Sequence, residues 1–186
     1  MSFSLVFTRR FSMAHRLLAS GSDKCAVPHG HNELVVVTLQ ATDERRLDGA
    51  GNMVEPFERA KARWHRWIDD AVDHALQLSD RDPLIGWFRG HEPERLSRLL
   101  VTPGDPTTEL LAALFMAKIG AFLASDGDRL RCVEIKIEET PTNSVIFAGD
   151  PADILPRRFG AQDRTPWWQR SDMDINELDR LVSIPA

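Results

Sequence analysis

The chain has 186 residues, of which 42% are hydrophobic and 27% are charged, and its formal net charge is −5. These values suit one globular domain with its own core, and they exclude a disordered, collagen-like or disulfide-based chain. The negative charge argues against nucleic acid or an anionic membrane as a partner, because both bind basic surfaces. The N-terminus lacks a signal-peptide pattern and no apolar run is long enough for a membrane span, so we expect a cytoplasmic protein.

Two strands are predicted in the first part of the chain. Apolar residues alternate with polar ones over residues 3–15, which is the period of a β-strand. The segment 16–30 contains glycine, proline and small polar residues, so a loop is expected there. A second strand is predicted over residues 31–41, which include the run Leu-Val-Val-Val.

Helical spacing replaces this alternation from Phe57 onward, where apolar residues recur every three or four positions as far as Ala75. The following segment, 77–105, is rich in proline and glycine and is predicted to be a long irregular connection, inserted into the domain. A second helix is expected from Thr107 to about residue 124, with Thr107 or Thr108 as its N-cap.

Two further strands are predicted at residues 133–138 and 145–147, which gives the element order β-β-α-α-β-β. This order indicates an α+β fold with a four-stranded antiparallel sheet, formed by residues 1–149. Residues 150–186 are rich in proline, arginine and aspartate. We expect this C-terminal extension to pack on the body of the domain or on a neighbouring subunit.

The sequence His29-Gly30-His31 is the sharpest local feature. In an extended segment both imidazoles point to the same side, and an antiparallel hairpin would bring His15 close to His31. Three imidazoles with an open fourth position are typical of a catalytic zinc site. The alternative is a turn with two solvated histidines.

Cys25 precedes this motif by four residues and could approach the same site. It could be a base or nucleophile, a fourth metal ligand, or a structural buried cysteine. Asp73-His74, at the end of the first helix, could be a carboxylate-oriented general base or an ordinary capping pair. Glu139 could bind two adjacent N–H donors of a heterocycle, but position alone does not select it from the other glutamates of its strand.

Several strings together resemble one family, the 6-pyruvoyl-tetrahydropterin and 6-carboxytetrahydropterin synthases. FSMAHRL at residues 11–17 resembles the family's F-x-A-A-H-R-L, and KCAVPHGHN at 24–32 resembles K-C-x-x-x-H-G-H-N with the spacing of the bacterial 6-carboxy branch. Further matches follow in the family's order, namely GNMV at 51–54, VDHAL at 72–76, PTTE at 106–109 and EET at 138–140. The ordered match over residues 3–149 carries the resemblance more than any one motif.

This resemblance implies a T-fold (tunnelling fold), in which the sheets of several subunits close into a barrel. It implies a homo-oligomer, a trimer or a hexamer, with each site at a subunit boundary. The implied substrate is 7,8-dihydroneopterin triphosphate, which would lose triphosphate. The resemblance favours 6-carboxytetrahydropterin as the product, which is a step toward queuosine and other deazapurines. Alternatives are a 6-pyruvoyl product, a related zinc lyase acting on another pterin, and a non-catalytic metal-binding scaffold.

The resemblance also assigns a metal and a proton relay. Zinc (Zn2+) would be held by three ligands, His15, His29 and His31. Cys25 would be the proton-shuttling base, and Asp73 with His74 would be its relay. An inert scaffold has no need of all these groups together, which argues against the scaffold alternative.

For substrate binding, the resemblance assigns Glu139 to the amino-pyrimidine edge of the pterin, assisted by Thr107 and Thr108. Two departures concern the same region. Glu33 stands where an aromatic residue usually follows H-G-H-N, and Pro56 replaces the aspartate of V-x-D-F. These changes leave the implied metal ligands intact and bear on substrate choice.

Overall fold

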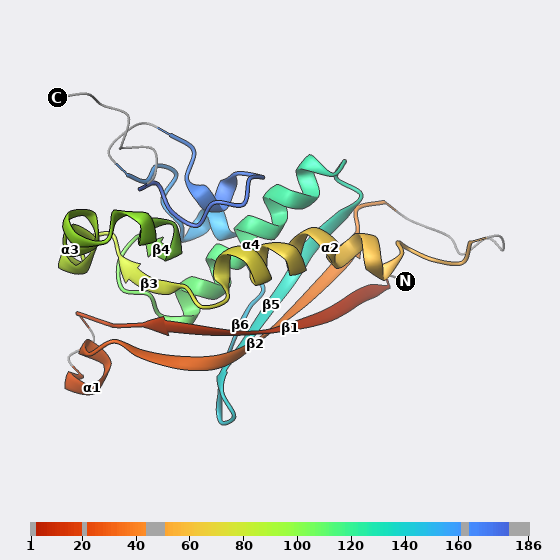
Figure 1. The fold of residues 1–186 in the computed structure, drawn as a ribbon. Coiled ribbons are helices and arrows are strands. Elements are labelled where there is room, and N and C mark those ends of the chain that lie inside the picture. The colour runs from red at the N-terminus through yellow and green to blue at the C-terminus, as the bar shows by residue number, and fades with distance from the viewer. Residues whose placement is uncertain (1–2, 20–21, 44–50, 161–163, 179–186) are drawn as a thin grey trace.

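The computed structural model describes residues 3–19, 22–43, 51–160 and 164–178. Within them one mixed sheet has the strand order β4-β3-β1-β2-β5-β6, and α2 and α4 lie on one of its faces (Figure 1). The strands are β1 (Ser4–His15), β2 (His29–Ala41), β3 (Leu76–Ser79), β4 (Leu99–Thr102), β5 (Leu130–Thr140) and β6 (Asn143–Phe147). The α-helices are α1 (Asp23–Ala26), α2 (Phe57–Trp67), α3 (Pro83–His91) and α4 (Thr108–Ser125).

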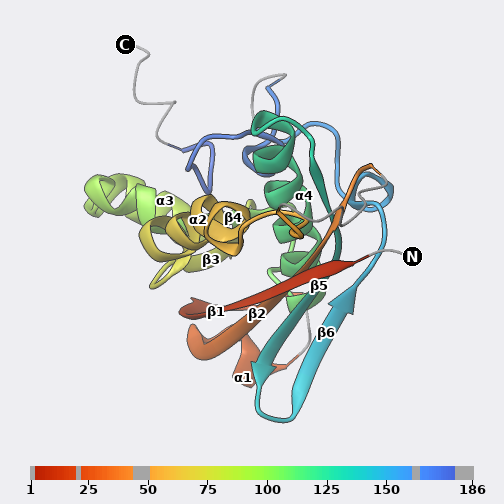
Figure 2. The same ribbon diagram turned by 90° about the vertical axis from the view of Figure 1, so that its right-hand side faces the viewer.

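Strands β1, β2, β5 and β6 pair antiparallel in that order and form the predicted four-stranded part of the sheet. Their alternation sends one set of side chains to the inner face. Figure 2 shows the four strands with α4 behind them on that face. The buried apolar residues of this face are Phe7, Phe11, Met13, Val35, Val37, Leu39, Ile135 and Ile137. The predicted α+β class and the four-stranded antiparallel part of the sheet are therefore confirmed.

Helix α4 is the central helix of the core. Thr107 is its N-cap, with a side-chain oxygen that accepts a hydrogen bond from the N–H of Leu110 at 3.3 Å, as predicted from the sequence. Of the described helices, α4 alone has the length and apolar composition of a membrane span. Half of it is buried against the sheet and its neighbours, which is the pattern of a core helix.

The segment 77–105 differs from the predicted irregular connection. It contains α3, a 3-10 turn at Pro93–Arg98, and β4, while β3 begins one residue before it. The short strands β3 and β4 are parallel to each other, and β3 is parallel to β1, so the sheet is mixed rather than purely antiparallel. Each has four residues and three or more of them are buried, so neither leaves an alternating pattern in the sequence.

The described part of the C-terminal extension packs on α4 of the same chain (Figure 1). Trp167 and Trp168 are fully buried, and Lys118 of α4 is also fully buried beneath this segment. The Lys118 ammonium donates to the backbone oxygens of Trp167, Arg170 and Asp174 at 2.9, 3.0 and 3.2 Å. Lys118 therefore ties the extension to the core helix.

Replacing Lys118 with methionine is expected to lower the free energy of unfolding by about 3 kcal/mol, because three buried carbonyls lose their donor. Burial lowers the pKa of Lys118 to about 8, so removal of the ammonium also relieves a desolvation cost that opposes this loss. Urea unfolding measures the net change in the free energy of unfolding, with Lys61→Met on α2 as the matched control. A Lys118→Met protein more stable than the wild type would show that the desolvation cost is the larger effect.

Candidate metal centre

Three histidines converge where the β1–β2 hairpin ends near α1. In the antiparallel register His15 lies directly opposite His29, and His31 lies opposite Met13. The ring centroids are 4.6 Å apart for His15 and His29, 5.1 Å for His15 and His31, and 5.2 Å for His29 and His31. The sequence predicted that His15 would approach His31 across the ladder; its direct partner is His29, and all three rings meet.

The motif His29-Gly30-His31 belongs to β2 and is not a turn. Its extended backbone sends both imidazoles to the inner face, as the spacing of two predicts. A Cβ at Gly30 would lie 3.1 Å from the carbonyl oxygen of Met13. Glycine therefore lets the two strands approach closely at the point where the rings meet.

Backbone carbonyls fix the orientation of two of these rings. The Nδ1 of His15 lies 3.0 Å from the oxygen of Pro106, and the Nδ1 of His29 lies 2.9 Å from the oxygen of Val27. A carbonyl oxygen can only accept, so in both rings Nδ1 carries the hydrogen and Nε2 keeps its lone pair. This is the second-sphere arrangement that positions histidine ligands of a metal ion.

The two Nε2 atoms face each other at 3.1 Å. Two lone pairs at that distance repel, unless a cation lies between them. Zn–N bonds of about 2.0–2.1 Å place two nitrogens of a tetrahedral site about 3.3 Å apart. One nitrogen from each of the three histidines lies within 4.8 Å of the others, so the donor set fits a metal of this kind.

Burial also favours the neutral ligand form of His15, which is 5% exposed. Desolvation lowers the pKa of His15, and the Coulomb effects of the two neighbouring rings act in the same direction. The hydrogen bond to Pro106 and the charge of Glu139 act in the opposite direction but are outweighed. A neutral imidazole at neutral pH is the form that binds a metal ion.

Cys25 lies on α1, between the two strands of the hairpin, and is a half-buried free thiol. The Cys25 carbonyl oxygen accepts a hydrogen bond from the N–H of Leu17 at 2.8 Å, which ties α1 to the end of β1. In the described part of the chain, the group of candidate metal ligands at this end contains the three histidines and does not contain Cys25. The geometry therefore does not favour Cys25 as a fourth ligand.

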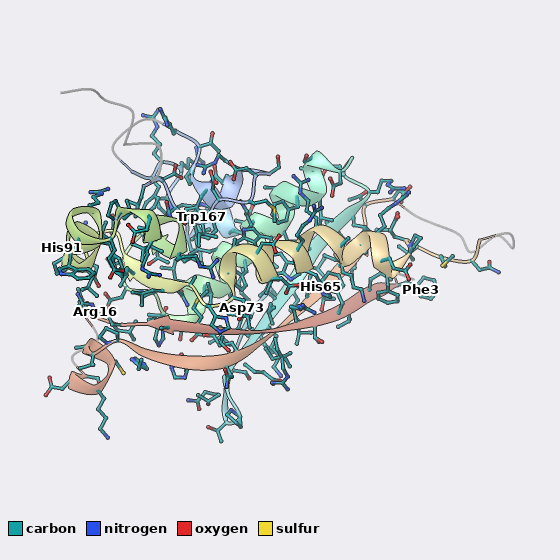
Figure 3. All side chains as sticks on the ribbon, in the orientation of Figure 1. Phe3, Arg16, His65, Asp73, His91 and Trp167 are labelled. Carbon is teal, nitrogen blue, oxygen red and sulfur yellow. The ribbon has the colours of Figure 1, made fainter. Side chains whose placement is uncertain are left out.

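Asp73 lies beside β1 (Figure 3) and forms a hydrogen-bonded pair with His74. The Asp73 carboxylate accepts from the N–H of Ser12 at 2.7 Å and lies 2.9 Å from Nδ1 of His74. Partial burial opposes ionisation of Asp73, but the Ser12 N–H and the His74 ring hold the pKa of Asp73 below its usual value. The predicted carboxylate partner of His74 is therefore present.

The His74 side chain is 75% exposed. It borders a surface groove with Ser12, Asn32 and His31. Ser12 and Asn32 belong to the outward-facing series of their strands, so the groove opens on the outer face of the sheet. Within one chain His74 thus shares a groove with His31, while His15 and His29 do not line it.

Glu139 is the glutamate of β5 that the structure brings to the cluster. Its Oε1 accepts a hydrogen bond from the Thr108 hydroxyl at 2.7 Å, and its charge acts on His15. Thr108 is the first residue of α4, so the positive end of the helix dipole lies beside this carboxylate. Thr107 has the different task of capping the helix.

Two buried polar residues near the cluster were not predicted as site residues. Glu33 is 3% exposed, and its Oε2 has no hydrogen-bond partner. Burial, followed by the charge of Glu139, raises the pKa of Glu33 to about 8. Gln77 lies opposite His15 in the β1–β3 register, is 1% exposed, and has an unpaired Oε1. The signal for the burial of Glu33 was the alternation of β2, because Glu33 is two residues before Val35 and therefore on the same face as the core valines.

A mixed, curved sheet with antiparallel hairpins, two helices on its inner face and this histidine cluster is the architecture of a T-fold protein. The sequence model of the 6-pyruvoyl tetrahydropterin synthase family matches residues 4–150. The chain therefore belongs to this family of tetrahydropterin synthases.

Individual relatives agree with this assignment. A 6-carboxy-5,6,7,8-tetrahydropterin synthase of Rickettsia bellii is 29% identical over 137 residues, covering 72% of this chain and 93% of the relative. The synthase of the same description from Bacillus subtilis is 29% identical over 146 residues, covering 78% of this chain and 85% of the relative. The solved structure of Caenorhabditis elegans 6-pyruvoyl tetrahydropterin synthase matches with a TM-score of 0.54 at 25% identity, covering 81% of this chain and 97% of that one.

Proposed function

We propose that this chain is a cytoplasmic zinc-dependent lyase that converts 7,8-dihydroneopterin triphosphate and water to 6-carboxytetrahydropterin, triphosphate and acetaldehyde, which carries away the two outer carbons of the side chain. The observation that carries the proposal is the convergence of three imidazoles, two of which have their Nε2 lone pairs turned toward each other by backbone carbonyls. Family membership supports a pterin substrate. The description of the Rickettsia and Bacillus relatives favours the 6-carboxy product.

In this proposal His15, His29 and His31 hold the zinc ion. When bound, the ion would polarise hydroxyl oxygens of the substrate side chain and acidify the neighbouring C–H groups. The carbonyls of Pro106 and Val27 keep two of the rings in the ligand tautomer. The burial of His15 keeps that ring neutral near pH 7.

Glu139 holds the pterin ring. Its carboxylate accepts from the amino group and the adjacent ring N–H, a pair of donors that matches the two oxygens of a carboxylate. The Thr108 hydroxyl orients this carboxylate, and the N-terminus of α4 stabilises its charge. The ring is thereby fixed so that its side chain lies toward the histidines.

Cys25 moves the proton, and the Asp73–His74 pair relays it. Because His74 is exposed on the outer face of the sheet, we propose that it serves the Cys25 of a neighbouring subunit in a homo-oligomer. The family that the chain resembles typically forms trimers or hexamers with sites at subunit boundaries, which supports this arrangement. The Asp73 carboxylate, bonded to the N–H of Ser12, orients the His74 ring.

A subunit-mixing experiment tests this arrangement. The Cys25→Ala and His74→Ala proteins are each expected to be nearly inactive. After denaturation and joint refolding at equal amounts, about one quarter of the sites should combine an intact Cys25 with an intact His74 from the next subunit. Activity near that level is expected in a product assay. A mixture as inactive as its components would place both residues in one chain.

The product itself decides between the two candidate reactions. The zinc-loaded protein is incubated with 7,8-dihydroneopterin triphosphate, and the pterin products are identified by mass spectrometry. We expect 6-carboxytetrahydropterin together with free triphosphate and acetaldehyde. A 6-pyruvoyl product would keep the enzyme class and change the reaction, whereas an unchanged substrate would contradict the proposed function.

A further inference from the structure

Glu33 is an acid on the inner face of the sheet, among the side chains that form the core and the histidine cluster. It follows His31 by two residues and precedes Val35 by two, so all three point to the same side of β2. Its exposure of 3% is close to that of the core residues around it. An acid at such a position is unfavourable to fold, unless it has partners.

The other buried charged residues in the described part of the chain do have partners. Asp82 pairs with Arg16, Glu55 lies 3.1 Å from Arg129, and Lys118 donates to several backbone oxygens. Glu33 differs from them, because its buried Oε2 has no hydrogen-bond partner. The fold therefore keeps an acceptor oxygen without using it internally.

The neighbours of Glu33 indicate where that oxygen acts. Phe11 of β1 lies opposite it on one side. On the other side, Leu34 and Glu138 form the last pair of the β2–β5 ladder, so Glu33 and Glu139 are the next residues of the two strands at this end, and the register of β5 with β6 is irregular at Glu139. Glu33 follows His31 by two residues on the same side of β2. Glu139 is bonded to Thr108, two residues after Pro106, whose oxygen contacts His15, so both carboxyl groups belong to segments that adjoin the histidine cluster.

We propose that Glu33 is a specificity-determining residue, which with Glu139 forms a two-carboxyl clamp for a heterocycle rich in N–H donors. The inference rests on the proposed function, and it adds a second acceptor to the single carboxylate assigned to the pterin ring. Two adjacent carboxyl groups are unfavourable in the free protein and become favourable when N–H donors of the ligand lie between them. The Phe11 ring provides an apolar boundary on the β1 side.

Binding of 7,8-dihydroneopterin to the zinc-loaded protein, measured by fluorescence titration, tests this inference. Glu33→Leu is expected to raise the Kd at least tenfold, while the zinc content stays at the wild-type level. Glu33→Gln keeps an acceptor oxygen and should show a smaller increase. In turnover, the effect of Glu33→Leu should fall on KM more than on kcat, because the residue lies at the ring and not at the proton relay.

The thermal midpoint separates this role from a structural one. Removing an unpaired buried carboxyl should make Glu33→Leu at least as heat-stable as the wild type, so weaker binding would not be due to misfolding. The control is Glu138→Leu, which removes a half-exposed glutamate paired with Lys136 and should leave the Kd unchanged.

The outcomes distinguish a failure of the proposed role of Glu33 from a failure of the proposed function. If the wild type binds 7,8-dihydroneopterin and Glu33→Leu binds it equally well, the role of Glu33 is overturned and the proposed function stands. If the wild type does not bind this pterin at all, both are overturned. A loss of zinc from Glu33→Leu would also overturn the inference, because Glu33 would then act through the metal centre.

Discussion

His29→Ala is expected to lose its bound zinc and to lower kcat/KM by about 10³-fold or more, since a Lewis-acid metal supplies several kcal/mol of transition-state stabilisation. The Nε2 of His29 faces that of His15 at 3.1 Å. The group of candidate ligands contains three imidazoles, so loss of His29 leaves two. Metal analysis of the purified protein and a steady-state assay with 7,8-dihydroneopterin triphosphate measure the two effects together.

His91→Ala is the control for this substitution. His91 lies at the end of α3 and stacks on Trp87, outside the cluster, so its removal should change neither zinc content nor activity. If His29→Ala retained a full equivalent of zinc with undiminished activity, the three-histidine centre would be wrong.

Cys25→Ala is expected to keep its zinc and to lower kcat by about 10²–10⁴-fold, the range for loss of a positioned general base. The physical reason is that Cys25 lies on α1 next to the hairpin but outside the group of metal ligands. A ligand cysteine would behave differently, because its removal would take the metal with it. Zinc content and kcat are therefore measured on the same preparation.

The chain offers a matched control for the thiol. Burial raises the pKa of Cys132 to about 12, so this second cysteine is not suited to proton transfer near neutral pH. Cys132→Ala should retain wild-type zinc content and kcat. Equal activity of Cys25→Ala and Cys132→Ala would remove Cys25 from the mechanism.

The histidine centre could be predicted because it depends on the simplest regularities of the chain. A spacing of two in an extended segment puts His29 and His31 on one side, and the preceding strand ends at His15. The register of the hairpin was not predictable to the residue. It pairs His15 with His29 because β2 begins two residues earlier than the apolar run indicated.

The parallel strands β3 and β4 could not be predicted in the same way. Each has four residues, and every residue of β4 is buried, so no alternation marks it. The pairing of β3 with β1, and of β4 with β3, depends on contacts between segments far apart in the sequence. The burial of Lys118 is a similar case, because a lysine within an apolar helix is explained only by the carbonyls of the C-terminal extension.

Glu33 was partly predictable from the sequence. Its position in the alternating series of β2 indicated burial, and its difference from the aromatic residue of the family motif marked it as unusual. The sequence did not show that Glu33 and Glu139 would lie at the same end of the β2–β5 ladder, because that relation depends on the pairing of the two strands. The convergence of the three histidines was therefore predictable from the sequence, whereas the burial of Glu33 beside them was not among its predictions.

X-ray absorption spectroscopy at the zinc edge, on the wild-type oligomer, tests the central claim most directly. The account predicts one zinc ion per chain, with three imidazole nitrogens at about 2.0–2.1 Å, a light-atom ligand in the remaining position and no sulfur. A sulfur ligand at about 2.3 Å, or a ligand shell with fewer than three imidazoles, would contradict it.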